Sequence, residues 1–432
     1  MKPSKASKPS RPSGSPRRSA LLVVALGAAS LALGLDALVA RAAPILHEYV
    51  PPPGKGDTGR WAREGRLPDH IRVEDRLLPK PRERGTADKG ERVLGGRRAS
   101  SKMDRATTVG PDRKTTHDGV LRYTAEFNPS VVPFKRMTAL DSVTAEFRLA
   151  VRDSTPQLVP LAKRPTPPDR DPFWGSLVLE AKAGKLMAIP SVAPGAAIVS
   201  YRTSSADGRA KSATVSFYRD SADNMSIRTN VSGQLRVVFL TDAPRSYFSP
   251  EIPPLITIAQ VPPSLRPLVP ANVRSAANKV LAHIGVTSSQ TMRRQLERLV
   301  AYFRNFEAKQ LERRSGNTYL DIALSQRGVC RHRSYAFVIT AQTAGIPARY
   351  VHNEAHAFAE AWVPRLGWLR IDLGGASSEL RVGNAQRKAV HNAGPDPFPR
   401  PSRYAGNYSQ LRGNVTGLRS NQRIRRTGTN LR

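Results

Sequence analysis

The stretch GVCRHRSYAF at residues 328–337 contains Cys330, the single cysteine of the chain. Two shorter stretches follow it: AHAFAEAWV, which contains His356, and GWLRID, which ends at Asp372. A cysteine nucleophile needs a base beside it and a third group that orients the base. A thiol, an imidazole and a carboxylate in this order therefore predict a catalytic triad of Cys330, His356 and Asp372.

The residues from Cys330 to Ala344 predict a helix that begins at the cysteine. Gly345 suits the left-handed position after a helix, and Pro347 cannot continue one. The helix N-terminus and the neighbouring Arg331 favour a thiolate. The backbone N–H of Cys330 is predicted to hold the oxyanion that forms during acyl transfer.

The runs 356–363 and 368–373 predict an antiparallel strand pair. Even-numbered residues of the first run share one face, and its alanines share the other, which we expect to pack on the helix. Trp362 and Trp368 are interpreted as lining the core or a substrate groove. Glu360 is interpreted as part of the wall of that groove or as a supporting group behind the reacting residues.

The register of this pair tests the triad. A three-residue turn at 365–367, with Gly367 left-handed, pairs Glu360 rather than His356 with Asp372. His356 would then lie about 13 Å away along the strand. We therefore expect a longer turn or a bulge to bring His356 to Asp372.

Together these residues resemble the transglutaminase-like superfamily. The resemblance covers about 260–380 and rests on Gly-x-Cys, the run GIPARY at 345–350, His356-Ala357-Phe358-x-Glu360 and Gly367-Trp368-x-x-x-Asp372. It implies a papain-like α+β fold in which Cys330 is the nucleophile, His356 the general base and Asp372 its orienting acid. The implied reaction is thioester-mediated acyl transfer, either hydrolysis or cross-linking, on protein or peptide amide bonds.

The sequence departs from the family pattern at two points. Arg331 follows the cysteine where the family often has an aromatic or acidic residue. Leu373 and Gly374 follow Asp372 where the family usually has proline. Neither departure removes a reacting group, so both bear on substrate preference.

The remaining chain divides by composition. Residues 1–43 have a basic head, an apolar run at 20–40 and a small-residue end, which predict a signal peptide or an uncleaved membrane anchor and hence export. Residues 44–118 are predicted to be a disordered linker. Short apolar runs within 119–250 predict a β-sandwich. The catalytic domain is predicted at 255–380, and a basic disordered tail at 381–432.

Inside the predicted β-sandwich, 121–127 alternates and 143–151 does so in part. Five apolar runs follow and carry the same strand signal: 176–181, 197–201, 213–218, 225–229 and 235–240. Before the cysteine, Asn272 is predicted to cap a helix that ends near Gly285. A second helix is predicted from Ser288 or Ser289 to about Ala308. Its apolar residues recur at three- and four-residue spacing.

The chain has a formal net charge of +34. Such a charge can attract a cell-envelope polymer, an anionic membrane or nucleic acid, but no nucleic-acid-binding motif is present. A single cysteine excludes an intramolecular disulfide and a cysteine-based metal cluster. We predict no metal and no cofactor, and a protein or peptide substrate. The alternative function is an inactive envelope-binding protein with the same fold.

Overall fold

The computed structural model describes residues 67–73, 76–85, 93–95, 107–114, 120–123, 136–162, 164–205, 213–248, 251–307, 309–312, 314–353, 356–374, 379–382 and 415–416. The predicted signal peptide or anchor at 1–43 and nearly all of the predicted tail lie outside these residues. Among the described helices, none has both the length and the apolar character needed to cross a membrane.

Four antiparallel strands form a sheet whose strands β17 and β18 are directly preceded by His356 and followed by Asp372, respectively. Their order is β18, β17, β16 and β6. Their bounds are β6 Thr138–Leu140, β16 Ala348–His352, β17 Ala357–Val363 and β18 Gly367–Ile371. Along the chain a run of helices precedes the run β16–β18, and such separate runs are typical of an α+β domain.

Helix α6 (Cys330–Thr343) packs on this sheet. The three alanines of β17 lie in the same hydrophobic core as the apolar side chains of α6. Alanine leaves room for a helix to approach closely, so the predicted packing of the alanine face is present. Gly345 has a φ of +87° and ends the helical turn as expected.

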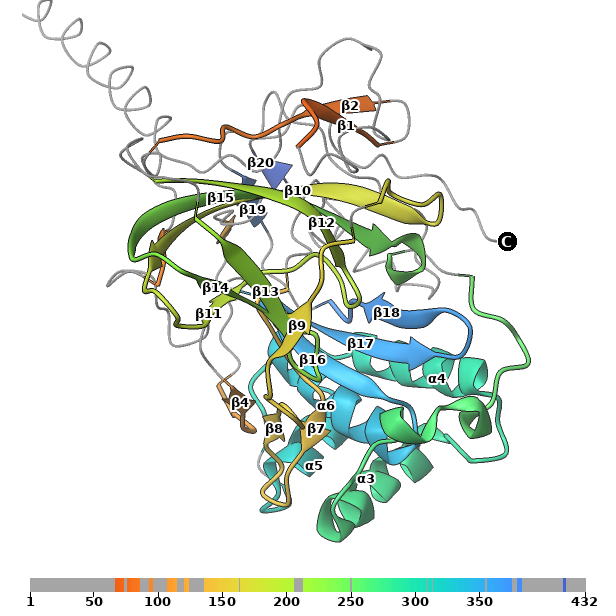
Figure 1. Ribbon diagram of the computed structural model, residues 1–432. Coiled ribbons are helices and arrows are strands. Elements are labelled where there is room, and N and C mark those ends of the chain that lie inside the picture. The colour runs from red at the N-terminus through yellow and green to blue at the C-terminus, as the bar shows by residue number, and fades with distance from the viewer. Residues whose placement is uncertain are drawn as a thin grey trace, which may run out of the picture. The chain divides into compact units, whose positions relative to one another are not determined.

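Three further helices join α6 on the same side of the sheet (Figure 1). They are α3 Ala271–Ile284, α4 Met292–Arg304 and α5 Thr318–Ser325. Pro270 rather than Asn272 precedes α3, and the Asn272 side chain instead donates to the Ala145 carbonyl. The expected capping role of Asn272 is therefore wrong.

Helix α4 is shorter than predicted at both ends. It starts after Thr291, whose hydroxyl accepts a hydrogen bond from Arg294 N, and ends at Arg304. Sequence reasoning missed α5. Asn317 caps it by accepting from Leu320 N, but eight residues are too short to show a helical period.

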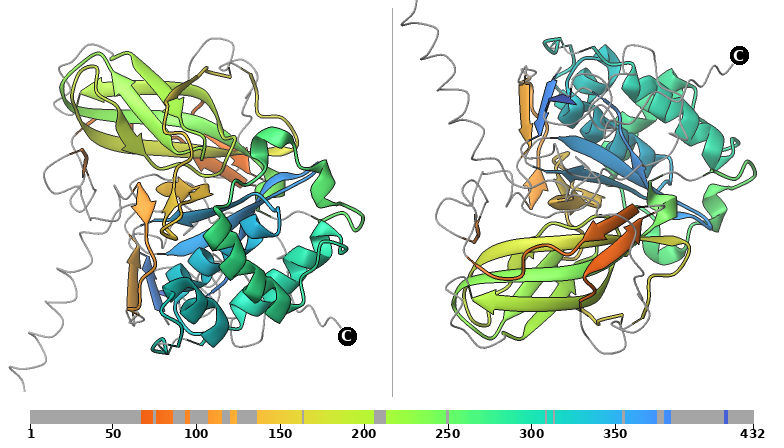
Figure 2. Two further views of the ribbon diagram at one scale, coloured as in Figure 1. Left: turned by 90° about the horizontal axis from the view of Figure 1, so that it is seen from below. Right: turned by 90° about the horizontal axis from the view of Figure 1, so that it is seen from above.

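Two other four-stranded sheets lie on the opposite side of the β16–β18 sheet from the helices (Figures 1 and 2). One has the order β12-β15-β10-β3 and the other β11-β14-β13-β9. Side chains of both sheets form a single hydrophobic core. We call these two sheets the two-sheet region. Their bounds are β3 Val93–Leu94, β9 Gln157–Val159, β10 Arg170–Ala181, β11 Met187–Ile189, β12 Ala197–Ser205, β13 Val215–Arg219, β14 Met225–Thr229 and β15 Gly233–Pro244.

Residues 136–150 were assigned by sequence to the β-sandwich, but the structure uses them elsewhere. β6 pairs with β16, and Leu140 lies in the core shared with the helices. β7 (Ser142–Val143) and β8 (Leu149–Ala150) pair with each other, and Val143 and Leu149 join that same core. A strand signal in sequence does not say which sheet the strand joins.

Described parts of the predicted linker 44–118 also form strands. β1 (His70–Val73) pairs with β2 (Arg76–Pro79), β3 pairs with β10, and β4 (Thr108–Val109) pairs with β8. Such short strands carry too few residues for a periodic signal, and their partners are distant in sequence. The remaining short strands, β5 Val120–Tyr123, β19 Glu379–Val382 and β20 Val415–Thr416, pair together.

Candidate active site

Cys330 is the first residue of α6 and is half-buried. The turn before it depends on Gly328, which has a φ of +132°. A Cβ at Gly328 would stand 2.6 Å from His332 Cβ. The Val329 N–H donates to His332 Nδ1 at 3.1 Å, which ties the turn to the helix. The cysteine is therefore held at the helix N-terminus, as predicted.

His356 and Asp372 lie in contact, with His356 Nε2 3.0 Å from Asp372 Oδ2. The predicted separation of about 13 Å is therefore wrong. The observed pairs include Trp362 with Trp368 and Ala359 with Ile371, so the strands are shifted by two residues from the predicted register. The residue numbers of each cross-strand pair still sum to an even value, so His356 and Asp372 remain on one face of the sheet. In the shifted register they are diagonal neighbours.

The β17–β18 register runs without a bulge. A separate tight turn before β17 holds His356. The Asn353 side chain accepts from His356 N at 2.8 Å, and Asn353 N donates to His356 O at 3.0 Å. Asn353 is fully buried and was missed by sequence reasoning. Asparagine side chains often form hydrogen bonds with the nearby backbone in turns, and this preference could have identified Asn353.

The His356 imidazole also lies close enough to the Cys330 side chain for each to shift the pKa of the other. Since Nε2 is engaged with Asp372, Nδ1 is the ring nitrogen left for the sulfur. Burial by itself would lower the pKa of His356, but the charge and hydrogen bond of Asp372 and the contact with Cys330 raise it to about 9. The imidazole is therefore held in its protonated form.

The pKa of the Cys330 thiol shifts in the opposite direction, downward. Burial by itself would raise the pKa of Cys330, but His356, the Ala357 backbone N–H and the charge of Arg331 lower it below its usual value. A low thiol pKa beside a high imidazole pKa favours a thiolate–imidazolium pair at neutral pH. The three predicted residues thus meet in one arrangement with the polarity that nucleophilic attack requires.

Further residues that sequence reasoning missed hold Asp372. Its Oδ2 also accepts from Arg370 Nη2 at 3.0 Å, and its Oδ1 accepts from Gly374 N at 2.8 Å. Its backbone carbonyl accepts from Arg304 Nε at 2.8 Å. Arg370 also lies over the Phe358 ring, 4.5 Å from the centroid. Gly374, which belongs to the second departure from the family pattern, therefore hydrogen-bonds the carboxylate directly.

The buried Arg333 links the loops on both sides of the site. Its guanidinium donates to the carbonyls of Gly328, Arg304, Phe306 and Leu373. The first of these precedes the cysteine and the last follows Asp372. Arg333 therefore holds the nucleophile loop against the carboxylate loop.

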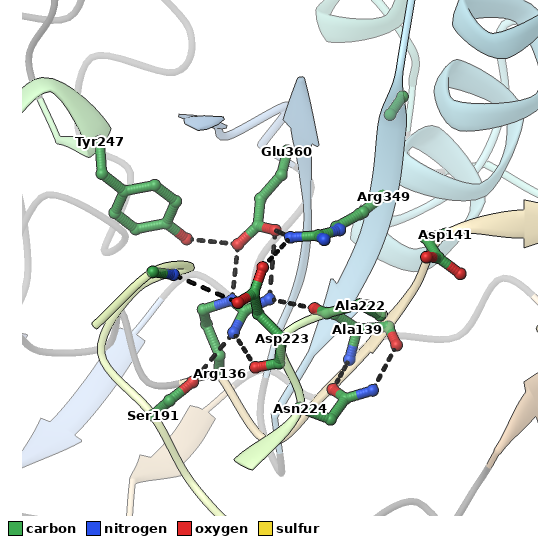
Figure 3. Close-up of polar contacts among 12 residues, drawn as sticks. Arg136, Ala139, Asp141, Ser191, Ala222, Asp223, Asn224, Tyr247, Arg349 and Glu360 are labelled. Carbon is green, nitrogen blue, oxygen red and sulfur yellow. Dashed lines mark hydrogen bonds and ion pairs between the residues drawn. The ribbon is translucent and has the colours of Figure 1, made fainter. Parts of the chain in front are cut away.

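Glu360 does not lie where the groove prediction put it. It is fully buried, and its Oε1 accepts from Arg136 Nε at 2.6 Å and from the Tyr247 hydroxyl at 2.7 Å (Figure 3). A side chain without solvent contact cannot line an open groove, so that prediction is wrong. The alternation of the strand gave no hint that a distant arginine would cover this face.

The two tryptophans are cross-strand partners but pack against different cores. Trp368 packs against the core of the two-sheet region, and Arg349 lies over its ring at 3.7 Å from the centroid. Trp362 is partly buried against the core beneath the sheet. Contact with substrate stays a prediction for both residues.

His352 does not compete with His356 as the base. It is buried on β16, and burial lowers its pKa to about 4, which the backbone of Asn353 offsets only in part. It therefore stays neutral. Within the described residues, no group of three or more histidine, cysteine, aspartate or glutamate side chains is arranged to hold a metal ion.

Comparison with known proteins agrees with this geometry. Residues 280–373 match the family model of the transglutaminase-like superfamily. The chain therefore contains a domain of that superfamily, and the resemblance seen in the sequence is confirmed. No curated protein of known function matches the chain.

Similar solved structures include the periplasmic domain of TgpA from Pseudomonas aeruginosa bound to ethylmercury. The identity is 15%, covering 62% of this chain and 95% of that one, with a TM-score of 0.36. A "Putative Cysteine Protease" from Cytophaga hutchinsonii is 13% identical over 48% of this chain and 78% of that one, with a TM-score of 0.30.

Proposed function

We propose that the protein is a cysteine enzyme that transfers acyl groups from protein or peptide amide bonds through a thioester. The proposal rests on one observation: His356 is held against Asp372 at 3.0 Å, at the N-terminus of α6 where it lowers the pKa of the Cys330 thiol. This arrangement supports a charged nucleophile paired with an acid already carrying the proton it must give up.

The steps follow from the protonation states. The thiolate attacks the amide carbonyl carbon, and the backbone N–H of Cys330 stabilises the resulting oxyanion. His356 gives its Nδ1 proton to the departing amine, the C–N bond breaks, and a thioester remains. Water or a second amine then attacks the thioester and returns a proton to His356, which releases the acid or the new amide.

Alkylation of the single cysteine tests the nucleophile. We expect iodoacetamide to modify Cys330 at pH values well below the reference thiol pKa of about 8.5. The His356→Ala variant should need a higher pH, because the thiolate loses its partner charge. Ordinary thiol behaviour in both proteins would support the alternative, an inactive binding protein.

Two assays then separate the reactions. Release of labelled fragments from casein reports hydrolysis, and incorporation of a dansylated primary amine into casein reports cross-linking. Activity in either assay should be lost in Cys330→Ala, whose fold is checked by its melting temperature. Activity that survives in Cys330→Ala would contradict the proposal.

Further parts of the proposal concern location and scaffold. The pattern of residues 1–43 supports export across a membrane, either with a cleaved signal or with an anchor. The shared core of the two-sheet region supports a β-sandwich. The strongly basic composition supports attachment to an anionic envelope polymer or membrane surface.

A further inference from the structure

A carboxylate is already bound beside the nucleophile. Arg331, the residue after Cys330, donates from Nε to Asp112 Oδ2 at 2.7 Å and from Nη2 to the Lys114 carbonyl. The Lys114 N–H donates to Asp112 Oδ1 at 2.5 Å. Asp112 belongs to residues 107–114, so a distant part of the chain places an acid at the first turn of α6.

A second group independently points to the same carboxylate. His332 is 2% exposed, and its Nδ1 accepts a hydrogen bond from Val329 N. The ring proton must therefore be on Nε2, which makes that atom a donor. Among the described residues Nε2 has no hydrogen-bond partner, and Asp112 Oδ2 lies 3.9 Å from it. A buried donor without a partner marks a place that can accept a better-seated anion.

The charge of the bound acid agrees with this geometry. Burial would raise the pKa of Asp112, but His332, Arg331 and the Lys114 amide hold it well below its usual range. The positive charge of Arg331 is also felt at the Cys330 sulfur. The anion position and the nucleophile therefore belong to one electrostatic environment.

We propose that Arg331 and His332 form a carboxylate-binding subsite next to Cys330, and that Asp112 occupies it in place of a substrate group. The favoured peptide substrates would then carry an acidic side chain near the bond that reacts. Substrate binding would exchange one carboxylate for another, so the Arg331 charge stays paired throughout. This inference rests on the proposed function, because it assigns the substrate class of the same site.

The subsite can be tested by alkylation alone. Two probes of nearly equal size are N-iodoacetyl-aspartic acid amide and N-iodoacetyl-asparagine amide, which differ in one negative charge. Both probes react with the same thiolate, so the fraction of Cys330 that is ionised drops out of the ratio of their alkylation rates. The ratio therefore reports recognition of the anion and not the reactivity of the sulfur. The test therefore remains informative even if Cys330 proves to be an ordinary thiol.

Removing the internal competitor should raise the ratio. In Asp112→Asn we expect the aspartate-to-asparagine rate ratio to increase about three- to tenfold over wild type. If loosening of residues 107–114 were the only effect, both probes would accelerate equally and the ratio would not change. Asp153→Asn, a change at an exposed carboxylate elsewhere, should leave the ratio at the wild-type value.

Removing the cation should do the reverse. Adding Arg331→Gln to Asp112→Asn should return the ratio to the wild-type value or below. Arg294→Gln, an exposed arginine on α4, is the matched control. An unchanged ratio in Asp112→Asn would overturn the subsite, as would a raised ratio that persists after Arg331 is removed. Failure of the proposed function would appear separately, as ordinary pH dependence of Cys330 with iodoacetamide.

Discussion

At the residue scale, the Asp372 carboxylate determines which nitrogen of His356 faces the sulfur. Its Oδ2 contacts Nε2, while Arg370 and Gly374 N hold the carboxylate from two other directions. An imidazole fixed in this way cannot rotate without breaking a buried contact. The orientation of the base is thus a property of the carboxylate and its donors rather than of His356 alone.

The pH dependence of the reaction follows from the pair. Activity needs the thiolate and the imidazolium together, so kcat/KM should rise as pH passes the lowered Cys330 pKa and fall as His356 loses its proton near pH 9. The two limbs belong to the coupled pair and not to separate residues. Both limbs can be measured as a pH profile in whichever of the two casein assays detects activity. A rate that keeps rising beyond pH 10 would contradict the ion-pair assignment.

At the element scale, the turn before α6 decides where the nucleophile lies. Gly328→Ala should destabilise the fold by about 1–3 kcal/mol, because a side chain is strained at this φ and its Cβ would collide with His332. The melting temperature measures the first effect. Slower alkylation of Cys330 at neutral pH should report displacement of the helix start.

Gly184→Ala is the matched control for this change. Gly184 has a φ of +73°, but a new Cβ there would meet no atom within 4 Å. We therefore expect a cost of about 1–2 kcal/mol from the backbone alone and no change at the cysteine. Equal effects of the two substitutions on alkylation would contradict the role of the Gly328 turn.

The same scale shows how far the pattern of residues could predict the site. The alternation of residues along β17 correctly assigned its alanine face to the helix. The even sum of paired residue numbers correctly placed His356 and Asp372 on the same face of the sheet. The register was wrong by two residues because the turn between β17 and β18 runs over 364–366, with Val363 paired with Gly367, and not over the predicted 365–367. Helix α5 and the short strands before residue 115 were missed because they are too short to show a period.

At the scale of the whole molecule, a buried ion pair joins the β16–β18 sheet to the segment before β6 and to the two-sheet region. Arg136 contacts Glu360 of β17 and also donates to the carbonyls of Ala222 and Asp223 (Figure 3). Arg349, from the GIPARY run, reaches Asp223 at 2.9 Å. Glu360 of β17 and Arg349 of β16 therefore connect the two parts of the structure.

Breaking this connection should be costly. Arg136→Met or Glu360→Leu should each lower the free energy of unfolding by about 3–5 kcal/mol, because each leaves one charge buried without its partner. The double variant should cost less than the sum of the two. Urea denaturation measures the stability of the two single variants and the double variant. As a control, Lys309→Met at an exposed ion pair should change stability by less than about 1 kcal/mol. Strict additivity would contradict a coupled pair.

The sequence by itself determined the transglutaminase-like domain, the helix that begins at Cys330 and the three residues that meet at the candidate site. These depend on residue types at short spacing, which local geometry fixes. Only the tertiary structure decided the contact of His356 with Asp372, the burial of Glu360 by Arg136 and the placement of Asp112 against Arg331. Each of these joins groups whose separation is set by chain turns and by packing between distant segments, and no local pattern encodes that separation.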